Sequence, residues 1–511
     1  MARVVGIRCT IDFDGDGALE AGEIETGRVI SASGNHAYTT AFAPLQSGAG
    51  VEDSCTLILN NADHRYDSLL TTATKYANTA SGGLYQREMS VEVCEDTTAG
   101  TPAWTTIFRG VVASITETSV TLDGASRVTL DCRSVEDRLL NARTSTTRAD
   151  FASYYDDGKN EAQLIKQWLL DAGASVAETQ YINDAAGRTG LFNIPWAWLD
   201  DESPIEDIWQ LAAACGGRFY YHPEGYYFYE NAQYWLHSSL SSMETIDRSV
   251  HNGVEILWDD RDLYKEITVE IGMRRPEGST VLWEPDELVQ VPANSTKVVV
   301  ARFDNPAYSV TGISYNAVSA GGLNLSASVA ITPTYYAQRA SLSIVNSHAT
   351  YAATLRNLQI TGEAVIGGPT AEENVTSAES FWTSRSPKTR ALRGNPYIQT
   401  RQQAKSLAAM LLDLTELPRA RFRLNNVRGK ATRRLGQKIT IGDSKIMSAD
   451  KTAYIVGLSW RFDEATGWTQ SIEAIDATAW FPYQASPGYF VLGNTPPTTG
   501  DTLGSAKVVF Y

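Results

Sequence analysis

Twelve residues near the start of the sequence have the types and spacing of a calcium-binding loop. Acidic side chains stand at positions 1, 3, 5, 9 and 12 of this loop, and a glycine stands at position 6, where such a loop turns sharply. Calcium takes six to eight oxygen ligands, which carboxylates and a backbone carbonyl supply. The candidate ligands are Asp12, Asp14, Asp16, Glu20 and Glu23, with Ala18 offering its carbonyl and Gly17 at the turn.

The segments on both sides of this loop predict a structural site rather than a sensory one. An EF-hand loop joins two helices, whereas residues 4–11 have the composition of a strand and residues 24–31 lack an amphipathic helical pattern. We therefore expect a calcium loop at the tip of a β-hairpin. The alternative is a solvated acidic turn, although five carboxylates within twelve residues would repel one another without a cation.

Other clusters of polar or aromatic residues are better explained by structure than by catalysis. Paired acids at 156–157, 200–202 and 259–260 show neither a defined separation nor a shifted pKa, and adjacent acids are usually solvated. Aromatic residues within 219–229 could stack sugars, but aromatics on paired strands more often form a core. The basic run 428–434 is expected as a turn before a strand. We therefore predict no catalytic and no cofactor-binding residue.

Composition narrows the class of protein. The chain has 511 residues and a net charge of −16, and about 100–200 residues per domain predicts several domains. Such an acidic chain argues against sequence-specific nucleic-acid binding and against docking on anionic membranes. The five cysteines are too dispersed for a zinc site or a disulfide framework and are expected as buried apolar residues. Neither a signal peptide nor a transmembrane run is recognisable, so a soluble protein made in a cytoplasm is expected.

Most of the sequence predicts short β-strands, so a mainly β chain is expected. The candidate strands are rich in β-branched or aromatic residues and are bounded by Gly, Asn, Asp or Pro. They include residues 4–11, 55–59, 90–94, 127–132, 265–271, 297–302 and 453–460.

Two segments have the apolar periodicity of amphipathic helices. Residues 161–172 carry one apolar face and are followed by Gly173 as a stop signal. Residues 401–414 carry another apolar face, and Thr400 with Gln403 has the spacing of a capping box.

A third helix is expected to lead directly into a β-hairpin. Ser203 and Glu206 have the spacing of a capping box, and the proline between them suits the first turn of a helix. Two glycines end this helix, and the aromatic segment after them predicts a hairpin that turns at residues 223–225.

Composition also changes along the chain and divides it into parts. Residues 290–370 are poor in charge and rich in Ser, Thr, Ala, Asn and Val, which predicts a small β-sandwich, and residues 366–398 have the composition of a connector. The predicted parts are a β domain with the acidic loop (1–148), an α+β insertion (149–250), a second β domain (251–289 with 371–482), the sandwich (290–370) and an extended tail (483–511).

Three passages occur in an order that resembles a known family. Residues 107–142 contain an F-x-G step and a D-R-L-L run, and residues 203–230 form the helix, Gly-Gly and hairpin passage. Residues 433–443 and 453–476 contain L-G-x-x-I and G-W-T-x-x-I-E strands. Together these passages resemble phage tail hub proteins, the baseplate hubs of contractile tails and the tail-tip hubs of siphophages. The resemblance covers about residues 1–145, 200–230 and 395–480.

This resemblance implies a multidomain, mainly β fold with small α+β insertions, in which two tube-like β-barrel domains flank inserted domains. It implies a non-enzymatic subunit of the virion tail tip, produced in the host cytoplasm, that connects the tail tube to the tip for genome delivery and host cell entry. In such hubs three copies form a pseudo-sixfold ring. The implied partners are two further copies, a distal tail or tube protein, a tape measure protein, and tip or receptor-binding proteins. An acidic lumen would let DNA slide without sticking.

Two other classes of function stay open at this point. A tail-associated cell-wall hydrolase would need a catalytic Glu, a Cys–His pair or a zinc site, and no segment shows one of these. A carbohydrate-binding receptor module would fit the uncharged residues 290–370.

Overall fold

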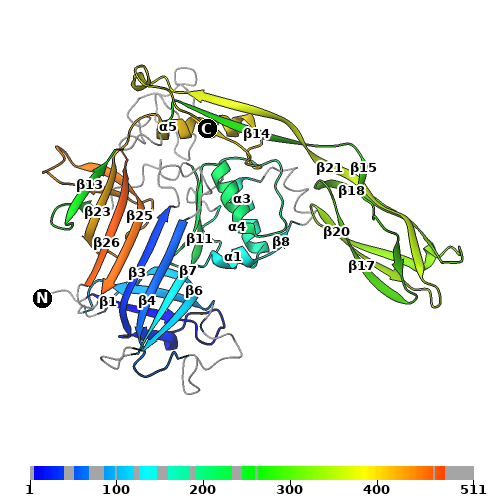
Figure 1. The fold of residues 1–511 in the computed structure, drawn as a ribbon, viewed down its shortest axis with the longest axis horizontal. Coiled ribbons are helices and arrows are strands. Elements are labelled where there is room, and N and C mark those ends of the chain that lie inside the picture. Colours follow the sequence, from blue (N-terminus) through cyan, green and yellow to red (C-terminus); the bar gives the residue numbers. More distant parts are fainter. Residues whose placement is uncertain are drawn as a thin grey trace, which may run out of the picture.

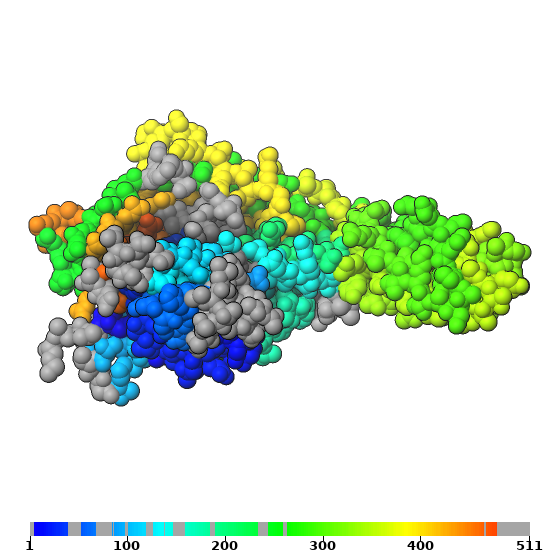
Figure 2. Space-filling model, turned by 60° about the horizontal axis from the view of Figure 1, so that its bottom comes forward, coloured from blue at the N-terminus to red at the C-terminus, as the bar shows by residue number. Residues whose placement is uncertain are grey.

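The computed structural model describes residues 5–38, 51–67, 84, 86–97, 101–119, 126–146, 159–183, 190–232, 244–258, 263–463 and 467–477, and all structural statements concern these residues. They form a body that contains a large sheet and a group of helices, and an arm that projects from the body (Figures 1 and 2). The prediction of a mainly β, multidomain chain is confirmed.

The main sheet combines strands from two distant parts of the chain. The described strands follow the order β13-β23-β26-β25-β3-β4-β7-β6-β5-β1-β2, while β24 pairs with β25 and β12 pairs with β24. The first part contributes β1 (Gly6–Ile11), β2 (Ile24–Thr26), β3 (Val29–Tyr38), β4 (Val51–Asn60), β5 (Glu88–Cys94), β6 (Thr105–Ser119) and β7 (Ser126–Ser134). The second contributes β12 (Thr245–Ile246), β13 (Gly253–Leu257), β23 (Arg421–Arg428), β24 (Lys438–Ile441), β25 (Lys451–Asp463) and β26 (Gly467–Asp476).

The two halves of this sheet are therefore one open sheet rather than two separate barrels. Antiparallel pairing of β3 with β25 joins them (Figure 1), so hydrogen bonds that could close each half on itself are used between the halves. Within the described residues the sheet ends at β13 on one side and at β2 on the other.

Alternating side chains along the strands form the cores under the sheet. In β7, Val128, Leu130 and Cys132 are buried, while the residues between them are less buried, as the two-residue period of a strand requires. All five cysteines are free and buried, so their interpretation as small core residues is confirmed.

The helical insertion packs beside the main sheet. It contains α1 (Asp137–Asn141), β8 (Thr144–Ser145), α3 (Glu161–Asp171), β9 (Asp200–Glu202), α4 (Pro204–Ala214) and the hairpin of β10 (Arg218–His222) and β11 (Tyr226–Glu230). Its apolar face includes Leu164, Ile165, Trp168 and Leu169 of α3, all fully buried. The predicted helices and the hairpin turn are confirmed, and Gly225 in that turn has a φ of +97°, which glycine adopts without strain.

The predicted capping of two helices is only partly correct. The Thr400 side chain accepts a hydrogen bond from the Gln403 amide (3.2 Å), but Gln403 Oε1 accepts from Gln399 rather than from Thr400. Ser203 does not cap α4, because its hydroxyl donates to the carbonyl of Leu139 (2.8 Å) and thereby ties α4 to α1.

A long two-stranded ribbon connects the body to the arm. Its strands β14 (Glu266–Pro276) and β21 (Ala353–Thr376) are antiparallel, and β22 (Thr389–Leu392) pairs with β14 in parallel. Helix α5 (Arg401–Thr415) contacts both ribbon strands. The expectation of a connector over residues 366–398 is wrong for its first third, because residues 366–376 continue β21 and pair with β14.

The arm, residues 277–365, contains two small sheets around one apolar core. One consists of β15 (Thr280–Trp283), β16 (Val289–Val291) and β18 (Ala307–Val318) on β21. The other has the order β17-β20-β19, with β17 (Ser295–Arg302), β19 (Val329–Tyr335) and β20 (Arg339–Asn346). Short 3-10 turns complete the described elements at Ala21–Glu23, Ser326–Ser328 and Ser380–Trp382.

Candidate cation loop and the seam of the main sheet

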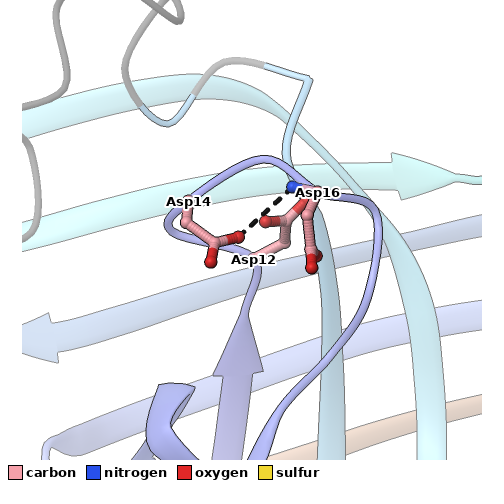
Figure 3. A group of neighbouring side chains, drawn as sticks. All are labelled: Asp12, Asp14 and Asp16. Atoms are coloured by element: carbon pink, nitrogen blue, oxygen red, sulfur yellow. Dashed lines mark hydrogen bonds between the residues drawn. The ribbon is translucent and has the colours of Figure 1, made fainter.

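The acidic loop lies at the tip of the β1–β2 hairpin, as the sequence predicts. The carboxylates of Asp12, Asp14 and Asp16 gather there, with one ligand oxygen of each within 4.8 Å of the others (Figure 3). Gly17 has a φ of +84°, which explains the glycine at the position where the loop turns. The loop thus brings three of the predicted ligands together.

Backbone amides of the loop hold these carboxylates in place. Asp12 is buried, and its two oxygens accept hydrogen bonds from the amides of Gly15 (2.5 Å) and Gly17 (3.1 Å). Asp14 accepts from the amide of Asp16 (3.2 Å). Amide dipoles directed at carboxylates lower the electrostatic cost of keeping the negative charges close together.

The remaining predicted ligands lie outside this cluster of three carboxylates. Glu23 is buried, and its carboxylate accepts from the amides of Phe13 (2.6 Å) and Glu20 (3.1 Å), so it fastens the two ends of the loop. Glu20 and Ala18 are exposed, and the Ala18 amide donates to Asp16 (2.8 Å). The sequence correctly predicted a loop at these residues. In this geometry, however, the Glu23 carboxylate holds the loop together through backbone hydrogen bonds and does not lie with the three aspartates.

The chain also supplies a positive charge to this loop. The guanidinium of Arg87, a mostly buried residue just before β5, packs against Gly15, where an added Cβ would lie 1.3 Å from Nη1. A side chain at this position would displace the guanidinium, and the φ of +80° at Gly15 is a conformation that favours glycine. The three carboxylates fit a hard cation such as calcium, and Arg87 offsets part of their repulsion when no cation is bound.

The seam between β3 and β25 is the second site that organises the molecule. Its register pairs Gly34 with Trp460, and the indole ring lies over the glycine so closely that a Cβ there would be 2.6 Å from the ring. A glycine in a strand costs backbone entropy, but here it leaves the space that the tryptophan fills. This pair therefore fixes how the two halves of the sheet meet.

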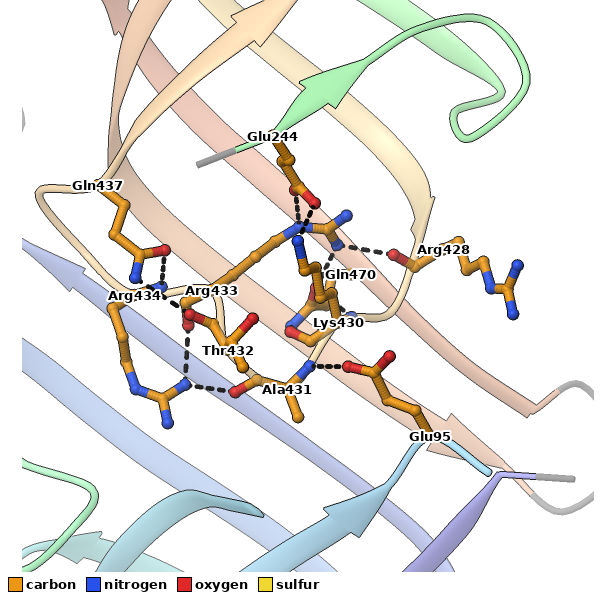
Figure 4. Close-up of polar contacts among 10 residues, drawn as sticks. All are labelled: Glu95, Glu244, Arg428, Lys430, Ala431, Thr432, Arg433, Arg434, Gln437 and Gln470. Atoms are coloured by element: carbon orange, nitrogen blue, oxygen red, sulfur yellow. Dashed lines mark hydrogen bonds and ion pairs between the residues drawn. The ribbon is translucent and has the colours of Figure 1, made fainter. Parts of the chain in front are cut away.

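The basic run forms a loop that contacts both halves of the main sheet (Figure 4). It lies between β23 and β24, so its interpretation as a turn before a strand is confirmed. Buried Arg433 pairs with Glu244 and donates to Gln470 and to the carbonyl of Arg428, and Lys430 pairs with Glu244 (2.8 Å). Although burial opposes it, the hydrogen bonds from Arg433 and Lys430 hold the pKa of Glu244 below its ordinary value.

Two contacts extend this loop to the first half of the sheet. The amide of Ala431 donates to Glu95 (2.8 Å), and Arg434 Nη2 donates to the carbonyl of Thr106 (3.0 Å). The side chains of Lys430, Arg433 and Arg434 are thus used in internal contacts.

A buried polar cluster joins the seam to the helical insertion. Glu230 of β11 is fully buried and accepts hydrogen bonds from the hydroxyls of Tyr38 (3.0 Å) and Tyr220 (3.0 Å). Arg218 lies over the Tyr38 ring and 3.8 Å from Glu230. Sequence patterns cannot find this cluster, because Tyr38 of β3 joins three residues of the distant β10–β11 hairpin only in the folded chain.

A second buried carboxylate organises the insertion itself. Glu161, the first residue of α3, accepts the amides of Leu191 (2.7 Å) and Phe192 (2.9 Å) and is approached by the Tyr229 hydroxyl (3.3 Å). Burial raises the pKa of Glu161 to about 7 despite these hydrogen bonds. Sequence patterns did not single out this residue beyond its place at the start of a helix.

The paired acids and aromatic residues behave as structural features where they are described. Asp200 and Asp201 approach Arg339 (3.7 and 3.4 Å), which links the insertion to the arm. Most of the aromatic side chains of β10 and β11 are buried, so their interpretation as core residues is confirmed. The acids at 156–157 and 259–260 lie outside the described residues.

Several solved structures are similar to the structure of this chain. No family model and no curated protein matches the sequence. The structure is similar to the tail protein from Neisseria meningitidis MC58 (TM-score 0.46, 11% identity, covering 93% of this chain and 98% of that one). It is also similar to the 43 kDa tail protein of prophage MuSo2 from Shewanella oneidensis (TM-score 0.47, 10% identity, 93% and 99%).

A third similar structure belongs to a secretion system. It is an Escherichia coli component of the type VI secretion system, described as similar to bacteriophage T4 tail proteins (TM-score 0.34, 9% identity, covering 88% of this chain and 73% of that one). At these identities and TM-scores the similarities assign neither an activity nor a partner to this chain.

In the described part of the chain, the helices are too short or too polar to cross a membrane.

Proposed function

We propose that this chain is a structural subunit of a phage-type tail tip, a hub that assembles with copies of itself into a ring continuing the tail tube. The observation that carries the proposal is the open main sheet, whose described strands end at β13 on one side and at β2 on the other. Strand edges of this kind are typically covered by a neighbouring molecule. The three sequence passages, which occur in the order of the hub family, support the same function.

The β13 edge has the surface expected of such an interface. Leu257 at the end of β13 is 41% exposed, and the neighbouring Trp258 is 65% exposed. Large apolar side chains exposed together, and tryptophan in particular, are characteristic of protein interfaces. We assign this edge to the contact with the next copy in the ring.

The proposed assembly contains three copies and carries no enzymatic activity. In it, the two halves of the main sheet of each copy form two successive sectors of a pseudo-sixfold ring. A tube protein and a tape measure protein would lie on one side of the ring, and tip or receptor-binding proteins on the other. The net charge of −16 suits a lumen through which DNA passes without binding.

Negative-stain imaging and mass photometry of the purified chain test this proposal. We expect ring-shaped trimers whose fraction rises with protein concentration. The double variant Leu257→Lys, Trp258→Lys should stay monomeric. The control is Ile446→Lys, which changes a residue of similar exposure in the loop between β24 and β25. A wild-type chain that stays monomeric at every concentration would contradict self-assembly.

Calcium binding by the acidic loop is a second, separate part of the proposal. The cluster of Asp12, Asp14 and Asp16 supports it, and a bound cation would rigidify the first hairpin of the ring-forming sheet. Calorimetric titration with calcium should show binding at millimolar or lower concentration, lost in Asp14→Asn and kept in the control Asp304→Asn, an exposed acid in the arm. If Asp14→Asn and Asp304→Asn bound calcium equally well, the loop would be a solvated acidic turn rather than a calcium site.

A further inference from the structure

The sheet of the arm with the order β17-β20-β19, called the outer sheet from here on, has one edge with exposed apolar residues. Within the described residues β17 pairs only with β20. Val298 and Val300 on β17 are 62% and 54% exposed, and their cross-strand partners place them on the same face as Val345. The sheet therefore turns a row of valines toward solvent beside a strand edge (Figure 2 shows the arm projecting from the body).

The two edges of this sheet differ in how they are protected. The opposite edge, β19, contains Pro333, and a proline lacks the amide hydrogen that a further strand would need. Strand β17 has no proline, and its Lys297 side chain reaches back to the carbonyl of Gln290 (3.3 Å). An apolar edge without such protection is an aggregation hazard unless another strand covers it.

Outside β17, which itself carries Lys297 and Arg302, the sequence around this edge is poor in charge. One fifth of the residues in the chain are charged, yet residues 305–338 contain no Asp, Glu, Lys or Arg. Residues 478–500 are uncharged as well. Residues 478–500, which precede the C-terminal segment, could therefore run along the arm without removing water from a charge.

The sequence contains a segment with the same strand pattern as β17. Residues 505–510 read Ser-Ala-Lys-Val-Val-Phe, and residues 295–300 read Ser-Thr-Lys-Val-Val-Val. β-Branched and aromatic residues favour extended structure. The 27 residues between the last described residue, Ala477, and Ser505 can span up to about 90 Å when extended, and their content of Gly, Pro and Thr favours a linker.

We propose that residues 505–511 add to the β17 edge as a fourth strand of the arm's outer sheet. Strand addition to a free edge supplies main-chain hydrogen bonds, and side-chain contacts set the register. An antiparallel register that places residues 508–510 opposite residues 298–300 brings Lys507 opposite Ala301 and Tyr511 opposite Lys297. The parallel register of the matching patterns would bring Lys507 beside Lys297, and like charges in that position are destabilising.

Hydrogen exchange of β17 in the full chain tests the proposal. We expect the amides of residues 295–302 to exchange slowly in the full chain and about tenfold faster or more in a variant that ends at Gly504, because edge amides without a partner strand are open to water. The double substitution Val298→Lys, Val300→Lys should prevent residues 505–511 from docking. The amides of β17 should then exchange as fast as in the shortened variant. The matched control is Ala330→Lys, Thr334→Lys, which alters exposed residues on the protected edge β19 and should leave the exchange of β17 slow.

Photo-crosslinking identifies the occupant directly. A photoreactive residue in place of Phe510 should link to the peptide that contains residues 295–302, and the mass of the product shows whether the strand comes from the same copy or from a neighbour; both products support the proposal. Links to any other surface would overturn it. Protection of β17 that survives removal of residues 505–511 and rises with protein concentration would instead assign the edge to a second copy of β17, and would also overturn it. None of these readouts depends on ring formation by the main sheet.

Discussion

The seam of the main sheet and the outer sheet of the arm are built in opposite ways. Near the seam, the charges of the buried residues Arg433 and Glu230 are satisfied inside the protein, Arg433 by the partly buried Glu244 and Glu230 by tyrosine hydroxyls. In the arm, the core is apolar and the outer sheet carries exposed valines on the edge strand β17. Buried ion pairs add little net stability but penalise any other arrangement. The seam is therefore specified by polar contacts that admit one register, whereas the arm leaves an apolar edge for another strand.

Removing one partner of the buried network should give the largest effect. Arg433→Ala leaves Glu244 with Lys430 as its only partner in this network and removes one of the two donors to Gln470 Oε1. We therefore expect the main sheet to lose about 3–5 kcal/mol of unfolding free energy. The matched control is Arg423→Ala, whose side chain is 47% exposed where it pairs with Glu473 and should cost about 0–1 kcal/mol. Denaturant unfolding followed by tryptophan fluorescence measures both. Equal midpoints would show that the network does not specify the seam.

Stability of the body should depend on pH, and stability of the arm should not. The pKa of Glu161 is raised to about 7 in the folded chain, so the folded state binds more protons than the unfolded state. Its stability is fully present below the ordinary pKa near 4.5 and falls as the pH rises toward 7, by about 3 kcal/mol in all.

Thermal unfolding from pH 5 to pH 8, with hydrogen exchange to separate the two regions, measures this dependence. Glu161→Gln should flatten the slope in the insertion, while Glu206→Gln, an exposed residue of α4, should keep it. If the unfolding free energy of the arm depended on pH as steeply as that of the insertion, Glu161 would not be the cause of the pH dependence.

Crowding the seam should weaken it by a steric route. Gly34→Val would push the Trp460 ring out of its place, since a Cβ at this position lies 2.6 Å from the ring, and overpacking of this kind costs about 1–3 kcal/mol. The control Ser33→Val changes the adjacent, exposed position of β3. Near-ultraviolet circular dichroism reports the tryptophan environment, and an unchanged spectrum for Gly34→Val would refute the packing role of the pair.

The smallest effect is expected on the outer face of the arm. Val298→Thr keeps a β-branched residue on an exposed position, so the unfolding free energy of the arm should change by less than about 0.5 kcal/mol. By contrast, Leu342→Ala removes a fully buried residue of β20 and should cost about 2–5 kcal/mol. If the two variants unfold at the same temperature, Val298 is part of the core rather than of a binding face.

Local signals in the sequence were reliable because they act over a few residues. Alternating apolar residues predicted β7, periodic apolar residues predicted α3, and the acidic spacing predicted the hairpin loop at Asp12. The pairing of β3 with β25 could not be predicted, since no local pattern tells which distant strand covers an edge. The continuation of β21 through Gly367 and Gly368 was missed for a related reason: pairing with β14 overrides the low strand propensity of the glycines.

The β3–β25 seam also has a consequence for how the protein is made. About 410 residues separate the end of β3 from the start of β25, and at about 5–20 residues per second the ribosome needs roughly 20–80 s to synthesise them. During that time the first seven strands exist with the β3 edge uncovered. Buried His36 and Asp53 near that edge are then open to water, and their solvation would discourage wrong strands from pairing there. The order of synthesis thus leaves the joining of the two halves as a late step in folding.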